Sequence, residues 1–394
     1  MLETKEMKNK GKRLISTVLL FLFSVSIWSY LNQSVYSISR QVPYIAFVVA
    51  YGVLGFFLQK RDEIIDLSII ALLVYDLFSL VINNGGIGSL LIQVYIIVFI
   101  TTIKNIVFTK NELRYLLLVN FIMWIAWIVR SPGYYTAFSF DPTILNSNGA
   151  AEITLFSFEF ITIILRLFYS KHKYLKVFVL GLWVVTFWGL WGFQSRSVEV
   201  AAIFFIICLY IIPSNFWNKF NVVLMSMIIG IGGTIFPFIY LLLQNNTYLS
   251  QQIYDLTSKS LYSGRQNIWI DVIQNGFNNS LRNWLLGLGS NANSGVSTIW
   301  GTNMHNSYLL IILNFGILGL ILFGIYVIKN VINVYNTSVK FKNSNIIIFL
   351  FAFWSFMIIG WSETIMVWEM TLPFVFSFLA FGQNYYWSKE EINK

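Results

Sequence analysis

The sequence predicts an all-α, polytopic integral membrane protein with about 12 transmembrane helices and a large extracytoplasmic loop before the tenth. Of its 394 residues, 57% are hydrophobic and only 11% are charged, whereas about a quarter of the residues in soluble domains are charged. Runs of about 18 apolar residues recur along the whole chain, which is the length a helix needs to cross the hydrocarbon core. No stretch has the composition of a separate soluble domain, so residues 1–394 are expected to form a single transmembrane domain.

The expected spans follow one another at short intervals. A basic segment, 8–13, precedes the first span as in a signal peptide, but no small-residue cleavage site follows, so an uncleaved first helix is expected. The single cysteine, Cys208, lies in an apolar span, which excludes an internal disulfide and a cysteine-based metal site. The spans lie near 14–31, 44–59, 67–82, 87–103, 115–129, 150–169, 177–193, 198–212, 221–243, 306–328, 346–362 and 371–383.

The distribution of lysine and arginine over the loops orients these spans. With a cytoplasmic N-terminus, the cytoplasmic segments carry nineteen of the 26 basic residues and the opposite loops carry six. Because cytoplasmic loops are enriched in Lys and Arg, both termini are expected in the cytoplasm. The net charge of +9 then reflects membrane topology, and no nucleic-acid partner is expected.

The segment 244–305 is the longest break in the apolar pattern, and it is expected to be a large external loop that carries part of the active site. Its run 266–277 has apolar residues at helical spacing, which predicts an amphipathic helix at the membrane surface. Arg265 precedes that run. Five of the six external basic residues are arginines, whose planar fork of donors suits phosphate oxygens. They are Arg40, Arg130, Arg196, Arg265 and Arg282.

Two further residues, near the external ends of expected spans, carry groups suited to chemistry. Glu199 follows Arg196 by three residues, so the two side chains share a helical face, either as an ion pair at the membrane edge or as part of an anion clamp. His305 stands at the outer edge of the tenth span, and histidine is the side chain best suited to accept a proton near neutral pH. The other histidine, His172, lies among lysines on the cytoplasmic side and is interpreted as a solvated loop residue.

Charged residues also occur inside the expected spans. Glu152, Glu159 and Arg166 recur every seven residues and therefore lie on one side of a single helix. Asp76 lies in another span. Since intramembrane charges usually face partners or a polar cavity, Arg166 is expected to pair with Glu159, and a proton-coupled transport path is the alternative.

The external segments carry a series of short motifs in a fixed order. They are Ser195-Arg196, Ser263-Gly264-Arg265 with Ile268-Trp269, Gly287-Leu288-Gly289, and His305-Asn306-Ser307-Tyr308-Leu309 with Gly316-Ile317-Leu318-Gly319. Taken in this order, the motifs resemble the O-antigen ligase and polysaccharide repeat-unit polymerase family. Arg265 followed by ten residues and then Gly276 is also similar to the arginine–glycine spacing of the polymerase branch. The resemblance covers the C-terminal half only, since the N-terminal half matches just in its run of spans.

The resemblance implies an inverting, metal-independent glycosyltransferase that acts on undecaprenyl-diphosphate-linked sugars, with no cofactor. His305 would be the general base that deprotonates the acceptor hydroxyl, and Arg196 and Arg265 would hold the donor diphosphate. Guanidinium groups near a low-dielectric boundary would stabilise the charge of the departing diphosphate. Supporting roles are expected for Glu199, Arg282, Asn306 and Arg130.

Three functions compete on this evidence. A polymerase of capsule, exopolysaccharide or O-antigen repeat units is favoured over a ligase that passes the finished glycan to another acceptor. A flippase for the same lipid-linked units is the alternative from another class, although no internal repeat is evident. The expected location is the cytoplasmic membrane of a bacterium with an extracytoplasmic active site. The expected partners are the lipid bilayer, a chain-length regulator and a flippase.

Overall fold

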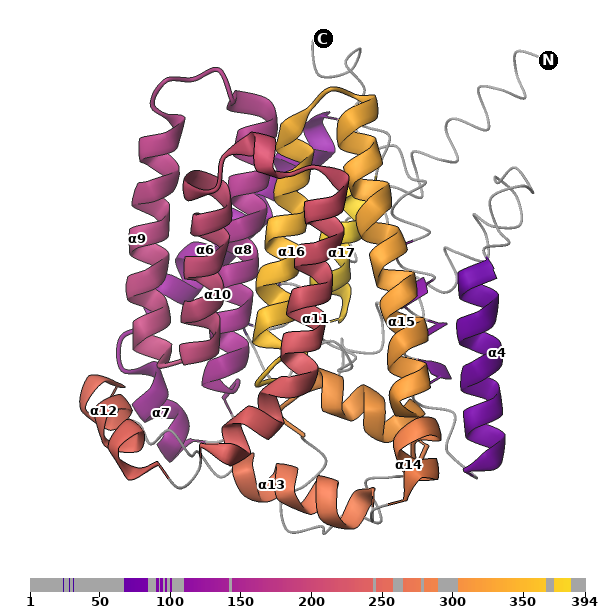
Figure 1. Cartoon of the computed structure of the whole chain (residues 1–394). Helices are drawn as coiled ribbons and strands as arrows, with labels where there is room; N and C mark the ends of the chain where they lie inside the picture. Colours follow the sequence, from indigo (N-terminus) through magenta and orange to yellow (C-terminus); the bar gives the residue numbers. More distant parts are fainter. Residues whose placement is uncertain are drawn as a thin grey trace, which may run out of the picture.

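The computed structural model describes an assembly of helices, and no strand occurs in its described residues (Figure 1). These residues are 67–83, 110–141, 144–243, 246–257, 265–277, 280–289, 304–365 and 372–383, with isolated positions in 24–31 and 90–100.

Most of the described helices coincide with the expected spans. The expected spans 14–31 and 44–59, and much of 87–103, lie outside the described residues. The helices that match are α4 (Leu67–Ile82), α6 (Lys110–Arg130), α8 (Ser147–Tyr169), α9 (Leu175–Phe193), α10 (Arg196–Ile206), α11 (Lys219–Leu242), α15 (Ser307–Lys340), α16 (Ile348–Ile359) and α17 (Leu372–Gly382).

Four described helices are long and apolar enough to cross a membrane, namely Asn111–Arg130, Leu175–Phe193, Lys219–Leu242 and Ser307–Lys340. Shorter apolar helices occupy Leu67–Ile82 and Ser344–Ile359. The described part of the chain is therefore mostly helical and contains four candidate membrane spans, which is consistent with a membrane protein but does not confirm the expected count of twelve.

Helix α8 forms the centre of the bundle. It is buried on nearly every side, and most of its residues lie between α6, α9, α10 and α16. Asn146 caps its first turn by accepting a hydrogen bond from the backbone N–H of Asn148 at 2.9 Å. This start of α8 lies at the same end of the bundle as α7 (Tyr134–Phe140) and α13 (Arg265–Asp271) (Figure 1).

The expected pair of Arg166 with Glu159 is wrong. The Arg166 guanidinium lies 5.0 Å from the ring centre of Tyr210, and Glu159 Oε1 accepts a hydrogen bond from Ser355 Oγ at 2.7 Å. Seven residues of α-helix span about 10 Å along the axis. The shared helical face therefore leaves the two groups too far apart for direct contact.

The tenth expected span, 306–328, is not one continuous helix. The chain breaks at Gly316, whose φ of 71° is left-handed, and the second part of α15 continues to Lys340. Helix α14 (Leu281–Leu286) packs against the break so closely that a Cβ on Gly316 would lie 2.1 Å from the carbonyl oxygen of Leu285. Two backbone N–H groups, of Leu288 and Gly289, donate to carbonyls of the first part of α15. The first part of α15 is thus a separate short helix held at one end of the bundle (Figure 1).

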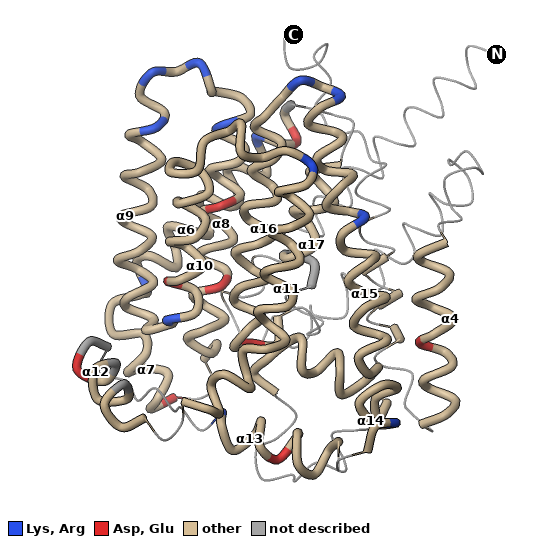
Figure 2. The backbone as a smooth tube through the Cα atoms, viewed as in Figure 1, with Lys and Arg blue, Asp and Glu red and all other residues tan. Residues whose placement is uncertain are grey.

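The described part of segment 244–305 is largely helical and not an open loop. It contains α12 (Thr247–Thr257), α13, the π-helical turn η4 (Val272–Gly276) and α14. The predicted amphipathic run is confirmed: its buried face includes Trp269 and Phe277. Figure 2 shows lysine and arginine gathered at the opposite end of the bundle, around the α8–α9 turn and the end of α15. The segment therefore covers the less basic end.

Candidate active site

A buried carboxylate, Glu363, organises the candidate site. Its Oε1 accepts hydrogen bonds from Arg265 Nη2 at 2.5 Å and from Asn148 Nδ2 at 2.7 Å. Its Oε2 lies 3.1 Å from Nδ1 of His305. The Glu363 side chain is 7% exposed, whereas those of Arg265 and His305 are 21% and 26% exposed. Three segments far apart in the sequence therefore converge on one carboxylate, and two of their side chains remain accessible.

The surroundings favour the charged form of this carboxylate. Burial raises the pKa of Glu363, but the Arg265 guanidinium and the contact with His305 outweigh burial, so its pKa lies below the usual value. An ionised carboxylate only accepts hydrogen bonds, so Nδ1 of His305 is the donor in the contact with Glu363. In the neutral imidazole Nε2 then carries the lone pair, which is the form that accepts a proton.

The backbone holds His305 in an uncommon conformation. Its φ of 47° is in the left-handed region, which few residues other than glycine adopt. The flanking residues are fixed on both sides: the carbonyl of Met304 accepts from Trp269 Nε1 at 2.8 Å, and the N–H of Ser307 donates to the carbonyl of Gly360 at 2.9 Å. Strain of this kind persists only where the surrounding contacts determine it.

Asn306 fastens three helices together directly beside the histidine. Its Oδ1 caps α15 by accepting from the N–H of Leu309 at 2.7 Å. Its Nδ2 donates to the carbonyls of Trp361 at 2.7 Å and Gly233 at 3.1 Å. Because the side chain is fully buried and both of its ends are bonded, Asn306 positions the site and does not face a substrate.

Arg265 is placed by the apolar face of α13. Trp269, four residues further on, is fully buried and packs edge-on against Tyr240 and Phe236 of α11, at centroid distances of 5.0 and 6.0 Å. These contacts fix α13 across the end of α11. The first residue of α13, Arg265, is thereby directed at Glu363.

Arg196 belongs to the same neighbourhood. It is the first residue of α10, and burial lowers the pKa of its guanidinium; the nearby Arg265 guanidinium also lowers it, whereas Tyr240 and Glu199 raise it. The structure therefore brings together three of the predicted site residues, His305, Arg265 and Arg196, with Glu199 beside the last of them.

Two other predicted arginines lie in different contacts. Arg130 Nη1 donates to the carbonyl of Leu31 at 3.0 Å, and its guanidinium lies 5.7 Å from the ring centre of Trp127. Arg282 Nη2 lies 3.4 Å from the carbonyl of Ile82, at the end of α4. Neither arginine contacts Glu363 in the described structure, so their visible interactions are with the scaffold.

Sequence reasoning missed Glu363 and assigned no role in the site to Asn148. The available signal was the position of Glu363, since Trp361-Ser362-Glu363 directly follows the apolar run of α16 at the end that was predicted to face outward. Its contact with His305 crosses 58 positions in the chain and its contact with Asn148 crosses 215. Such long-range contacts leave no periodic pattern in the sequence.

The arrangement is suited to acid–base work next to an anion. A carboxylate that orients an imidazole increases the basicity of the ring and fixes its tautomer, as in the triads of hydrolases. Two guanidinium groups nearby supply donors in the planar geometry that phosphate oxygens accept. Among the described residues, no group of three or more His, Cys, Asp or Glu side chains is arranged to hold a metal ion.

Comparisons with known proteins add no assignment. No family model, no curated protein and no solved structure matches the chain.

Proposed function

We propose that the protein is a polysaccharide polymerase that joins lipid-linked oligosaccharide repeat units at the outer face of the cytoplasmic membrane. The observation that carries this proposal is the Arg265–Glu363–His305 cluster at one end of a bundle of apolar helices. It combines an oriented base with a cationic group, which are the two requirements for transferring a sugar from a diphosphate to a hydroxyl.

The proposed reaction is an inverting displacement. The acceptor hydroxyl oxygen attacks the anomeric carbon of the donor, its proton passes to Nε2 of His305, and the bond from that carbon to the diphosphate oxygen breaks. The electron pair of that bond leaves with the lipid diphosphate. Arg196 and Arg265 stabilise this charge, while Glu363 stabilises the imidazolium that forms.

The distribution of charge supports an outward-facing site. The cluster lies at the end of the bundle opposite the lysine-rich turns in Figure 2, and lysine-rich turns are typical of the cytoplasmic side. Repeat units that have crossed the membrane would meet the cluster at the outer surface. A flippase and a chain-length regulator would act on the same units before and after transfer.

The proposal is tested with purified protein, lipid-linked repeat units from the source bacterium and a chelator, without nucleotide. We expect a ladder of products from the wild type and from His172→Ala, whose histidine lies at the opposite end of the chain's central helix, and none from His305→Ala. A ladder of products from His305→Ala would refute the role of His305 as the general base. Absence of any ladder with native units would refute the polymerase.

A transporter of lipid-linked units is the second candidate, and one observation favours it. Asp76 of α4 is fully buried, and neither of its carboxylate oxygens has a hydrogen-bond partner in the described part of the chain. Buried carboxyl groups within membrane helices are frequent in proton-coupled transport. A transporter would move the units between leaflets and leave their length unchanged, and a ligase would move one finished glycan to a different acceptor.

A further inference from the structure

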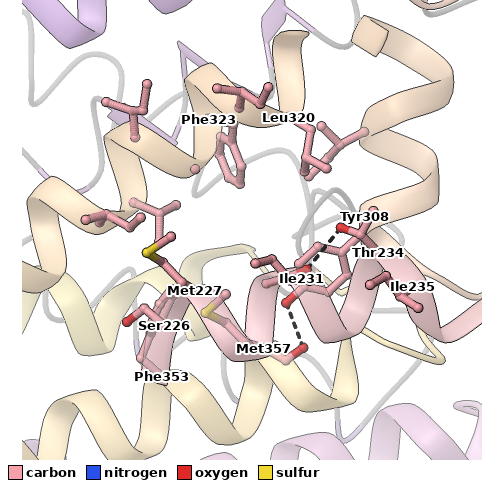
Figure 3. Close-up of a pocket in the computed structure, with 17 residues that line it drawn as sticks. Ser226, Met227, Ile231, Thr234, Ile235, Tyr308, Leu320, Phe323, Phe353 and Met357 are labelled. Carbon is pink, nitrogen blue, oxygen red and sulfur yellow. Dashed lines mark hydrogen bonds between the residues drawn. The ribbon is translucent and has the colours of Figure 1, made fainter. Parts of the chain in front are cut away.

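An apolar cavity of about 440 Å³ lies between α11, α15 and α16. Figure 3 shows side chains from these helices around it, among them Met227 and Ile231 of α11, Phe323 of α15 and Met357 of α16. Pockets that bind small molecules measure about 300–1,000 Å³. The cavity is therefore large enough for a ligand and lacks charged residues in its lining.

Two glycines keep this cavity open. Gly230 of α11 and Gly324 of α15 both line it, and a Cβ added to either one would have no atom within 4 Å. Gly233, one turn further along α11, is different because its Cβ would collide with the Tyr308 ring at 2.2 Å. The space at Gly230 and Gly324 is therefore unfilled, whereas the helices at Gly233 are tightly packed.

The cavity reaches the outer surface of the bundle. Ile231, Ile321 and Ile325 line it and are 54%, 52% and 50% exposed. They belong to α11 and α15, both of which are long and apolar enough to cross a membrane. An opening between two such helices would face the hydrocarbon of a bilayer, so we call the cavity a groove that is open on this side.

One end of the groove lies close to the candidate active site. Tyr308 and Met357 both line it and are joined by a hydrogen bond of 3.1 Å from Tyr308 Oη to the Met357 carbonyl (Figure 3). Tyr308 follows His305 by three residues, and Met357 precedes Glu363 by six. Three and six residues span at most about 10 and 21 Å along the chain. The same two chain segments thus connect the groove to the catalytic cluster.

We propose that this groove binds the polyprenyl chain of the lipid diphosphate donor, with the diphosphate at Arg265 and Arg196. This inference rests on the proposed function and names the part of the donor that the apolar walls recognise. Continuity with the cationic cluster favours a chain that carries a diphosphate. A docking helix is about 10 Å across and rises about 5.4 Å per turn, so the cavity would hold only about one turn of it.

The test measures binding of undecaprenyl diphosphate to the detergent-solubilised full-length protein. Gly230→Leu and Gly324→Leu fill the groove without striking a neighbour at Cβ. Gly181→Leu on α9 is the matched control, since its Cβ also has no atom within 4 Å and it lies outside the groove. We expect at least about tenfold weaker binding to both groove variants, equivalent to about 1.4 kcal/mol, and unchanged binding to the control at equal thermal stability.

Two outcomes would overturn the inference. Wild-type affinity in both groove variants would mean that the polyprenyl chain binds elsewhere. Equal competition by phosphatidylglycerol for binding to the groove would identify the occupant as a bilayer phospholipid. His305→Ala separates this inference from the proposed function, because it is expected to bind the lipid diphosphate but not to form a glycosidic bond. If the groove variants lost binding while the wild type formed no product, the result would support the groove as the lipid-binding site and refute the proposed polymerase activity.

Discussion

The buried polar groups at the Glu363 end of the bundle, which is the outer end in the proposed orientation, differ from those in its middle. At the outer end, both oxygens of Glu363 have partners, which come from α8, α13 and the residue before the α15 cap. In the middle, Glu159 Oε2 has no hydrogen-bond partner in the described structure, and the same holds for two nitrogens of Arg166. The outer groups form a connected network, while the central groups stand apart.

This difference indicates where chemistry takes place. A charged group in a low-dielectric interior is costly unless it is paired and hydrogen-bonded. The outer network meets that condition and leaves His305 partly exposed, so its groups are held ready for a substrate. Glu159 has a single hydroxyl donor and faces packed helices. A glycosyltransferase depends on the outer network, whereas a proton-coupled transporter depends on buried carboxyl groups within the helices, such as Glu159 and Asp76.

Replacement of His305 is expected to have the largest effect on activity, and it tests whether the outer network carries the chemistry. His305→Ala removes the proton acceptor, and general-base catalysis contributes about 10²–10⁴-fold to rate. We expect turnover to fall by that factor, measured as linkages formed per minute. His172→Ala is the control, and an equal loss in both variants would indicate that neither histidine acts as the base.

Replacement of the carboxylate separates orientation from binding. Glu363→Gln keeps the shape but removes the charge that orients His305 and holds Arg265. We expect kcat to fall by about 10–100-fold, as for other groups that orient an active residue, while donor binding is retained or tightened because Arg265 is released. Asp271→Asn, which alters a carboxylate of α13 outside the cluster, should behave like the wild type. A rise in KM at unchanged kcat would contradict the orienting role.

The cap residue next to the histidine should affect stability. Asn306→Ala removes a helix cap and two further hydrogen bonds in a buried position, which together contribute about 2–3 kcal/mol to the free energy of unfolding. We expect a lower thermal denaturation temperature in detergent. Asn336→Ala, at an exposed position of α15, should leave it unchanged. Equal stability of both variants would mean that the junction of the three helices does not depend on Asn306.

The charge of Glu363 should give a pH-dependent contribution to stability. Because its pKa is lowered in the folded protein, this contribution is fully present above the unfolded value of about 4.5 and is lost as the pH falls through the folded value. The denaturation temperature of the wild type should therefore exceed that of Glu363→Gln at neutral pH, and the difference should shrink as the pH falls through the lowered pKa of Glu363 in the folded protein. A constant difference over this range would mean that Glu363 stays neutral.

The smallest effect is expected in the middle of the bundle. Glu159→Gln keeps a group that accepts a hydrogen bond from Ser355 and should change the rate of glycosyl transfer by less than about twofold. Transport of lipid-linked units between leaflets of proteoliposomes is the matched measurement. Loss of transport in this variant, in a protein that forms no linkages, would favour the central groups over the outer network.

Hydrophobic periodicity predicted most of the described scaffold, because apolar runs of sufficient length form helices in a membrane. The expected span 67–82 matches α4, and the amphipathic run 266–277 matches α13 with η4. The break at Gly316 escaped prediction, since it depends on the packing of α14 against α15 and lies within a mainly apolar run.

The site was predicted only in part. His305, Arg265 and Arg196 stand out in the sequence because charged or titratable groups are rare in this chain. Glu363 is one acidic residue at the end of an apolar run, and its importance comes from partners far away in the sequence. The predicted pairing of Arg166 with Glu159 was wrong for a different reason. Helical periodicity shows that two side chains point in the same direction from the helix axis, but it does not show that they are close along that axis.

The most direct measurement counts lipid diphosphate released against glycosidic linkages formed by the purified protein on its native lipid-linked units. Glycosyl transfer at the Arg265–Glu363–His305 cluster predicts one lipid diphosphate for each new linkage, with both products lost in His305→Ala. Movement of units across the bilayer without release of lipid diphosphate, unaffected by His305→Ala, would contradict the assignment of that cluster as the active site.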